Sequence, residues 1–225
     1  MTHFDSEIDT LKQKLLVMAS RAEASVTNAI KALVERDDDL ARSIQETDDA
    51  IDVLEKEIDD EAIRLLAKAP LATQLRLIVS ATKIARDLER IGDEATTIAR
   101  RSIELSQEPQ LKAYVDLPRM ATMAMDMLND ALGAFVSGDT VKARSVIPRD
   151  KQVDALNKQL YRELASFMIE KPTTISRCLH LMTISKALER VADHAKNVAE
   201  DVVYLYEARD IRHTGGGGGS EPAAT

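Results

Sequence analysis

Apolar side chains recur along the start of this chain at alternating spacings of three and four residues, the pattern of one buried helix face. The first such run consists of Ile8, Leu11, Leu15, Met18 and Ala22. It predicts a long helix, with Ser6 as its N-cap, that ends at the charged cluster 36–39.

Two further runs follow before residue 110. A short helical piece over 40–45 is expected first, and the second run then extends to Pro70. Its apolar members are Ile51, Leu54, Ile58 and Leu65. The third run predicts a helix of roughly 30 residues that ends in the segment 107–110. Its members are Ile78, Ala81, Ala85, Leu88, Gly92, Ala95 and Ala99.

The chain then repeats itself. The segment ARSI at 41–44 returns as ARSV at 143–146, 102 residues later. The segment LERIGD at 88–93 returns as LERVAD at 188–193, 100 residues later. Because the matches keep their order along the chain, we infer an internal duplication. Each copy needs only short loops between neighbouring helices, which favours antiparallel bundles.

We therefore expect an all-α protein of two tandem, pseudo-symmetric three-helix bundles. The first spans residues 4–106 and the second 117–213, and the Gly-rich remainder, 214–225, is expected to be a flexible tail. The composition fits a helical fold. Aromatic residues make up only 3% of the chain and Trp is absent, so the core must consist of Ala, Leu, Ile, Val and Met.

The charge and hydropathy of the chain exclude several classes of function. A net charge of −8 without clustered Lys and Arg argues against nucleic acid as a partner. No apolar run approaches the ~18 residues that cross a bilayer, and no signal peptide is recognisable. A cytoplasmic protein that reaches a membrane only through its partners is expected. The one cysteine, Cys178, lies in an apolar stretch and is expected to be a buried thiol.

Pairs of carboxylates four residues apart lie beside the apolar runs. Such residues share one helical face and lie roughly 6 Å apart along the axis. Each copy has two pairs, namely Asp48 with Asp52, Glu89 with Asp93, Asp150 with Asp154, and Glu189 with Asp193. If the second and third helices of a bundle lie side by side, the two pairs of that bundle converge.

Converging carboxylates repel one another unless they are protonated or neutralised by a cation. Ligand sets made only of oxygen suit hard cations. We therefore expect a divalent or ferric ion in each copy, its identity open among Mg²⁺, Mn²⁺, iron, Zn²⁺ and Ca²⁺. The alternative is a solvated helix face whose acids pair with Arg90 and Arg190. His194 follows Asp193 but points about 100° away from it.

The segments 88–93 and 208–213 resemble the PhoU family, and the resemblance extends over about residues 4–214. It implies two tandem three-helix bundles whose Glu- or Asp-x-x-x-Asp motifs bind metal ions, and these motifs fall on the four acid pairs above. Two positions depart between the copies. The second copy has Ala192 where the first has Gly92, and alanine permits less close packing. The first copy has Asn28 where the second has Asp130, which would weaken the first site if that inner acid assists metal binding.

The resemblance also implies a regulatory function. Proteins of this family are peripheral cytoplasmic proteins that link a phosphate ABC transporter, through its ATPase subunit, to a sensor histidine kinase. They keep phosphate-starvation genes off when phosphate is plentiful. Direct phosphate binding is not expected, because the acidic patches would repel phosphate unless a metal ion bridged the two. Exposed apolar helix faces make a homodimer the expected assembly.

Three other interpretations compete with this one. An enzyme of the di-iron kind needs Glu-x-x-His pairs, which the sequence lacks, and no P-loop is present, so an enzyme is not expected. A structural helical adaptor would use the acids only for solubility and would bind no metal. An accessory protein of a low-affinity phosphate permease would share the fold but differ in partner.

Overall fold

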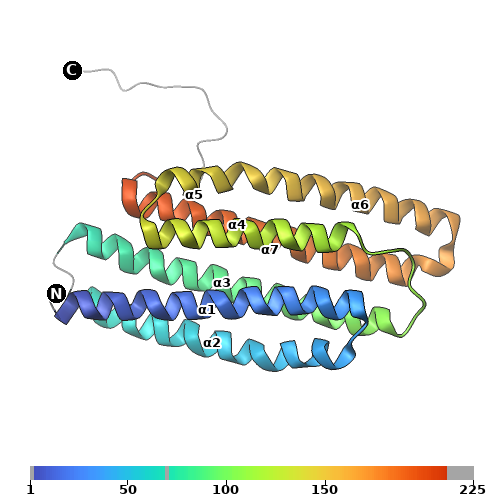
Figure 1. Ribbon diagram of the computed structural model, residues 1–225, viewed down its shortest axis with the longest axis horizontal. Coiled ribbons are helices and arrows are strands. Elements are labelled where there is room, and N and C mark those ends of the chain that lie inside the picture. The colour runs from blue at the N-terminus through green and yellow to red at the C-terminus, as the bar shows by residue number, and fades with distance from the viewer. Residues whose placement is uncertain (1–2, 69–70, 212–225) are drawn as a thin grey trace, which may run out of the picture.

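The computed structural model describes residues 3–68 and 71–211 and confirms an all-α fold of two tandem bundles. The first bundle consists of α1 (His3–Glu35), α2 (Asp38–Leu66) and α3 (Ala72–Ser106). The second consists of α4 (Asp116–Ser137), α5 (Thr140–Val146), α6 (Asp150–Glu170) and α7 (Ile175–Glu207), with the short turns η1 (Ile147–Arg149) and η2 (Pro172–Thr174) on either side of α6. Figure 1 shows the two bundles lying lengthwise against each other. The expected tail, 214–225, lies outside the described residues.

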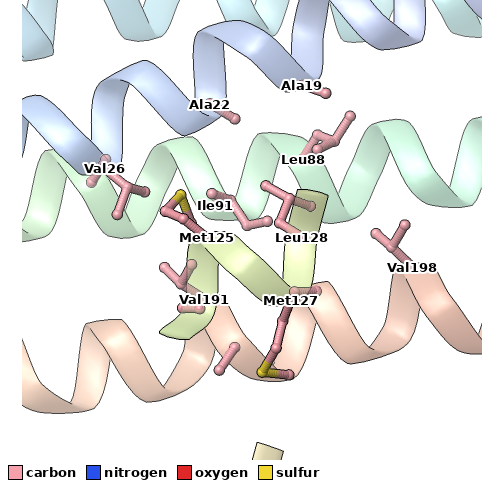
Figure 2. Packing of buried hydrophobic residues seen from close by; sticks show 14 of the residues in the cluster. Ala19, Ala22, Val26, Leu88, Ile91, Met125, Met127, Leu128, Val191 and Val198 are labelled. Carbon is pink, nitrogen blue, oxygen red and sulfur yellow. The ribbon is translucent and has the colours of Figure 1, made fainter. Parts of the chain in front are cut away.

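One continuous core joins the two bundles. α3 packs along α7, and α1 also contacts α4. Figure 2 shows Ala22 and Leu88 of the first bundle on the same core as Leu128 and Val191 of the second. The helices α2 and α6 lie on opposite outer edges of the molecule in Figure 1. The surfaces between α2 and α3, and between α6 and α7, therefore face outward.

The apolar runs of the first bundle are buried as predicted. Every member is buried except Leu54, which is partly buried against the core. The thiol of Cys178 is buried, as predicted. The predicted N-cap is wrong: α1 already includes His3, so Ser6 lies inside the helix, where its carbonyl accepts the Thr10 hydroxyl at 3.0 Å.

The turns that follow α1 and α4 are built alike. Arg36 and Gly138 take left-handed backbone angles, with φ of 58° and 72°. The next residues, Asp37 and Asp139, each cap the following helix by accepting a backbone N–H at 2.9 Å. A left-handed conformation costs an arginine energy that glycine avoids. The Arg36 guanidinium offsets this cost by donating to two backbone carbonyls at the end of α3 and just beyond it, at 2.6 and 2.7 Å.

The second helix is continuous in the first bundle and broken in the second. The predicted separate piece over 40–45 is wrong, because those residues form the start of α2. In the second bundle Pro148 occupies the position of Glu46. Proline has no backbone N–H and its ring clashes with the preceding turn of an α-helix. The chain accordingly leaves α5, passes through η1 and resumes as α6.

Candidate metal centre

The predicted acids of the first bundle meet where α2 faces α3. Asp48 and Asp52 lie on α2, and Glu89 and Asp93 lie on α3. Gly92 permits the close approach of the two helices, because a Cβ atom at this position would lie only 3.0 Å from Asp48 Oδ1. We refer to these four acids as the first acidic cluster. The spacing of four residues places the two acids of each pair on one face of their helix.

The carboxylates of this cluster act on one another. Burial raises the pKa of Asp48, and the nearby charges of Asp93 and Asp52 raise it further. Burial likewise raises the pKa of Glu89, with the charge of Asp93 adding to the effect and Arg90 opposing it. Each group therefore resists ionisation, as expected where like charges share a site. A bound cation would relieve both effects.

The border of the cluster does not remove the excess of negative charge. Arg90 donates a hydrogen bond to Asp93 at 3.0 Å and lies 3.4 Å from an oxygen of Glu89. Its guanidinium is exposed, and such surface pairs contribute about 1 kcal/mol or less. Glu55 adds another carboxylate, whose pKa is raised by burial and by the charges of Asp59 and Asp52.

A buried hydroxyl adjoins the same acids. The side chain of Thr96, on α3, is only 5% exposed. Its Oγ1 makes no hydrogen bond of ordinary geometry within the described residues, although it lies close enough to Asp48 to counteract the rise in the pKa of that carboxyl. A buried hydroxyl without a partner is costly. A water molecule or hydrated cation beside Asp48 would give Thr96 a partner.

The second bundle brings together the equivalent acids on α6 and α7. Asp150 has a pKa raised by burial and by the charges of Asp154 and Asp193, and lowered by the cation Lys196. These acids and Glu189 form what we call the second acidic cluster. The ammonium of Lys196 lies 2.9 Å from Asp193 Oδ1 and 3.5 Å from Asp150 Oδ2. A cation of the chain itself thus lies between acids that were predicted to hold a metal ion.

Lys196 stands where the first bundle has Thr96. Burial lowers its pKa, but Asp193 and Asp150 more than compensate, so the net shift is upward and the amine stays charged. Lys186 adds another cation, at 2.5 Å from an oxygen of Glu189. The first bundle has Arg86 at the position of Lys186, so Lys196 is the counter-charge that the first cluster lacks at the same position.

Two other residues singled out in the sequence lie elsewhere. Asp130 pairs with Arg149 at 2.6 Å and with Lys142 at 3.1 Å, and these contacts lower its pKa. His194 lies 2.8 Å from Asp87, through Nδ1, which agrees with the prediction that it points away from Asp193. Asp130 is thus already balanced by two cations.

The donor set of the first cluster suits a hard cation, since it consists of carboxylates and one buried hydroxyl. Within residues 3–68 and 71–211, no three Asp, Glu, His or Cys side chains converge as ligands of a single ion. Metal binding therefore stays a prediction. It requires rotation of side chains such as Asp93, which is exposed and able to turn.

The sequence identified the acids but missed the residue that distinguishes the two clusters. Thr96 and Lys196 each lie three residues beyond the last acid of the repeated motif, one helical turn along the same face. Extending the comparison of the two motifs by one turn would have found the exchange.

None of the helices in the described part of the chain could cross a membrane.

Comparisons with known proteins cover both bundles. The model of the PhoU domain matches residues 15–102 and again 117–202. A Pseudomonas putida protein named phosphate-specific transport system accessory protein PhoU homolog is 42% identical over 214 residues, which cover 94% of this chain and 84% of the relative.

Two solved structures have the same fold. The crystal structure of PhoU from Pseudomonas aeruginosa matches with a TM-score of 0.89 and 41% identity, over 92% of this chain and 100% of that one. The phosphate transport system regulatory protein PhoU from Streptococcus pneumoniae matches with a TM-score of 0.87 and 30% identity, over 93% and 99% of the two chains. With two domain matches and close relatives along nearly its whole length, this chain belongs to the PhoU family.

Proposed function

We propose that this protein is a cytoplasmic negative regulator of phosphate uptake and of phosphate-starvation signalling. It would couple the ATPase subunit of a phosphate ABC transporter to a sensor histidine kinase. The observation that carries the proposal is the similarity, over both bundles, to proteins named as accessory or regulatory components of phosphate transport. The protein would act through contacts made by its outer helices.

A bound cation is the second part of the proposal. Asp48, Asp52, Glu89 and Asp93 would hold a hard divalent or ferric ion, which would supply the positive charge that the first acidic cluster lacks. Because these acids come from both α2 and α3, the ion would also tie the outer helix to the bundle. The second acidic cluster would bind a cation more weakly, since Lys196 already neutralises two of its acids.

The test follows the proposed partners in the native host. Deletion of the gene should switch phosphate-starvation genes on in high phosphate, and the tagged protein should co-purify with the ATPase subunit and the kinase. Elemental analysis of the same preparation reports the bound cation, and light scattering reports whether it is the expected dimer. Normal repression in the deletion strain, with neither partner recovered, would contradict the proposal. Recovery of a low-affinity phosphate permease in their place would assign the chain to that transporter instead.

A further inference from the structure

The outer surface of the second bundle contains a groove of about 640 Å³ between α6 and α7. Its lining consists of Asn157, Lys158, Tyr161 and Arg162 from α6 and Lys186 from α7. Of the described residues that line it, none carries a carboxylate. We call it the α6–α7 groove. A lining with three cations and no acid is unexpected in a protein whose net charge is −8.

Two of these cations have no counter-ion. Lys158 and Arg162 are four residues apart on the exposed face of α6, where like charges repel each other. Neither makes an ion pair with another residue in the described part of the chain. Arg162 donates only to the backbone carbonyl of Lys158, at 3.3 Å. The groove therefore presents two uncompensated positive charges beside the partly exposed ring of Tyr161.

The first bundle has a corresponding groove whose outer helix contributes acids instead. Between α2 and α3 lies a groove of about 430 Å³. Its α2 side consists of the carboxylates of Glu55 and Asp59, whereas its α3 side includes Glu89 and three cations, Lys83, Arg86 and Arg90. By the spacing of the repeat, Glu55 corresponds to Asn157 and Asp59 to Tyr161. The fold thus tolerates acids at these positions. The acid-free lining of the α6–α7 groove is therefore not a requirement of the bundle fold.

The floor of the α6–α7 groove is fixed. The buried Ser185 hydroxyl donates to Asn157 Oδ1 at 2.6 Å, which holds the side chain of Asn157 against α7. Further along the same helices, Ile169 is 82% exposed and Leu179 is 52% exposed. At helical spacing Ile169 continues the row of Lys158 and Arg162, so an exposed apolar side chain lies on the same face of α6 as the two cations. From Lys158 to Ile169 this surface extends about 16 Å, or three helical turns.

We propose that the α6–α7 groove docks an acidic amphipathic helix of a protein partner, an inference that rests on the proposed regulatory function. The acidic face of that helix would meet Lys158 and Arg162, and its apolar face would cover Tyr161 and Ile169. Charge complementarity selects this occupant. The opposite edge of the molecule repels it, because α2 contains eleven acidic and only three basic residues.

The experiment uses the full-length protein with the purified ATPase subunit and the cytoplasmic part of the kinase as probes. A double charge reversal, Lys158→Glu with Arg162→Glu, should lower the affinity for one of the two by at least about tenfold. The matched control is Lys56→Glu, the equivalent of Lys158 in the first bundle, which should leave both affinities unchanged. All three side chains are exposed, and circular dichroism checks that each variant is folded.

A photo-crosslinking residue placed at Tyr161 should attach to an acidic helix of that partner, whereas the same residue at Asp59 should not. Unchanged affinity of the double variant for both probes would overturn the docking proposal and leave the proposed function standing. Failure of the wild type to bind either probe would remove both. Binding of ATP or inorganic phosphate that the double variant abolishes, without any crosslink to a partner, would reassign the groove to a small anion and also overturn the proposal.

Discussion

The two bundles carry carboxylate pairs at equivalent positions but balance their charges differently. In the first, Thr96 leaves the acids without an internal cation, and burial raises the pKa of Asp48 and Glu89. In the second, Lys196 bridges Asp150 and Asp193. A single exchange in a duplicated motif therefore places a cation of the chain within one carboxylate cluster and not within the other.

The grooves beside these clusters also differ in the charge of the residues that the outer helix contributes. The α2–α3 groove includes Glu55 and Asp59, whereas the α6–α7 groove has Asn157 and Tyr161 at those positions. The outer helix of one bundle thus offers a surface for cations, and that of the other a surface for acidic groups. Duplication preserved the core, which packing constrains, while the outward-facing positions were free to diverge.

The largest expected effect comes from making α2 resemble the broken helix of the second bundle. Glu46→Pro removes a backbone donor inside a continuous helix and should lower the free energy of unfolding by about 3 kcal/mol. Urea unfolding measures this change in the free energy of unfolding. The reciprocal change, Pro148→Glu, should alter it by less than about 1 kcal/mol, because the chain there already forms η1. A Glu46→Pro variant as stable as the wild type would show that both bundles accommodate the break equally.

The next largest effect is expected from exchanging Thr96 and Lys196, the residues that distinguish the two clusters. Thr96→Lys should lower the affinity of the first cluster for Mn²⁺ by at least about tenfold, or about 1.4 kcal/mol, because an ammonium would occupy the site of the ion. Lys196→Thr should strengthen binding at the second cluster by a similar factor. Isothermal titration calorimetry measures both changes.

The control for this exchange is Lys151→Thr, which removes an exposed lysine from α6 and should leave both affinities as they are. Because Thr96 is buried, thermal melting followed by circular dichroism checks that the Thr96→Lys variant still folds its first bundle. If the exchanged variants bind Mn²⁺ as the wild type does, Lys196 is not the reason that the clusters differ.

The smallest expected effect is on the pH dependence of stability. Asp48, Glu55 and Glu89 have folded-state pKa values above their ordinary ones, so the folded chain binds more protons than the unfolded chain. Stability of the cation-free protein should therefore rise as the pH falls from about 7 to about 5. Asp130, whose pKa is lowered, stabilises the fold until its carboxylate is protonated at still lower pH.

Asp48→Asn isolates this contribution, because it removes one repelling charge without changing the size of the side chain. In the presence of a chelator it should raise the free energy of unfolding at neutral pH by about 0.5 kcal/mol and flatten the pH dependence. Saturating Mn²⁺ should reverse the order of the two proteins, since only the wild type keeps the full set of ligands. Equal stability of both proteins, with and without the ion, would argue against repulsion within the cluster.

Much of the fold was predictable because helical periodicity is a local property of the sequence. The apolar runs identified the buried faces, and the repeat identified two bundles. The predicted break after residue 45 was wrong because an apolar pattern cannot show whether two helical pieces are collinear. Ser6 was wrong as a cap because the helix already includes His3, several residues before the first member of the apolar run.

By itself the sequence determined the helices, the duplication and the positions of the acid pairs, because each depends on spacing along one chain. Only the tertiary structure decided which charges are balanced. Lys196 lies beside Asp150, and Arg149 beside Asp130, through contacts between different elements of the second bundle. Charge balance depends on distances in space and on burial, and neither is a property of a single helix.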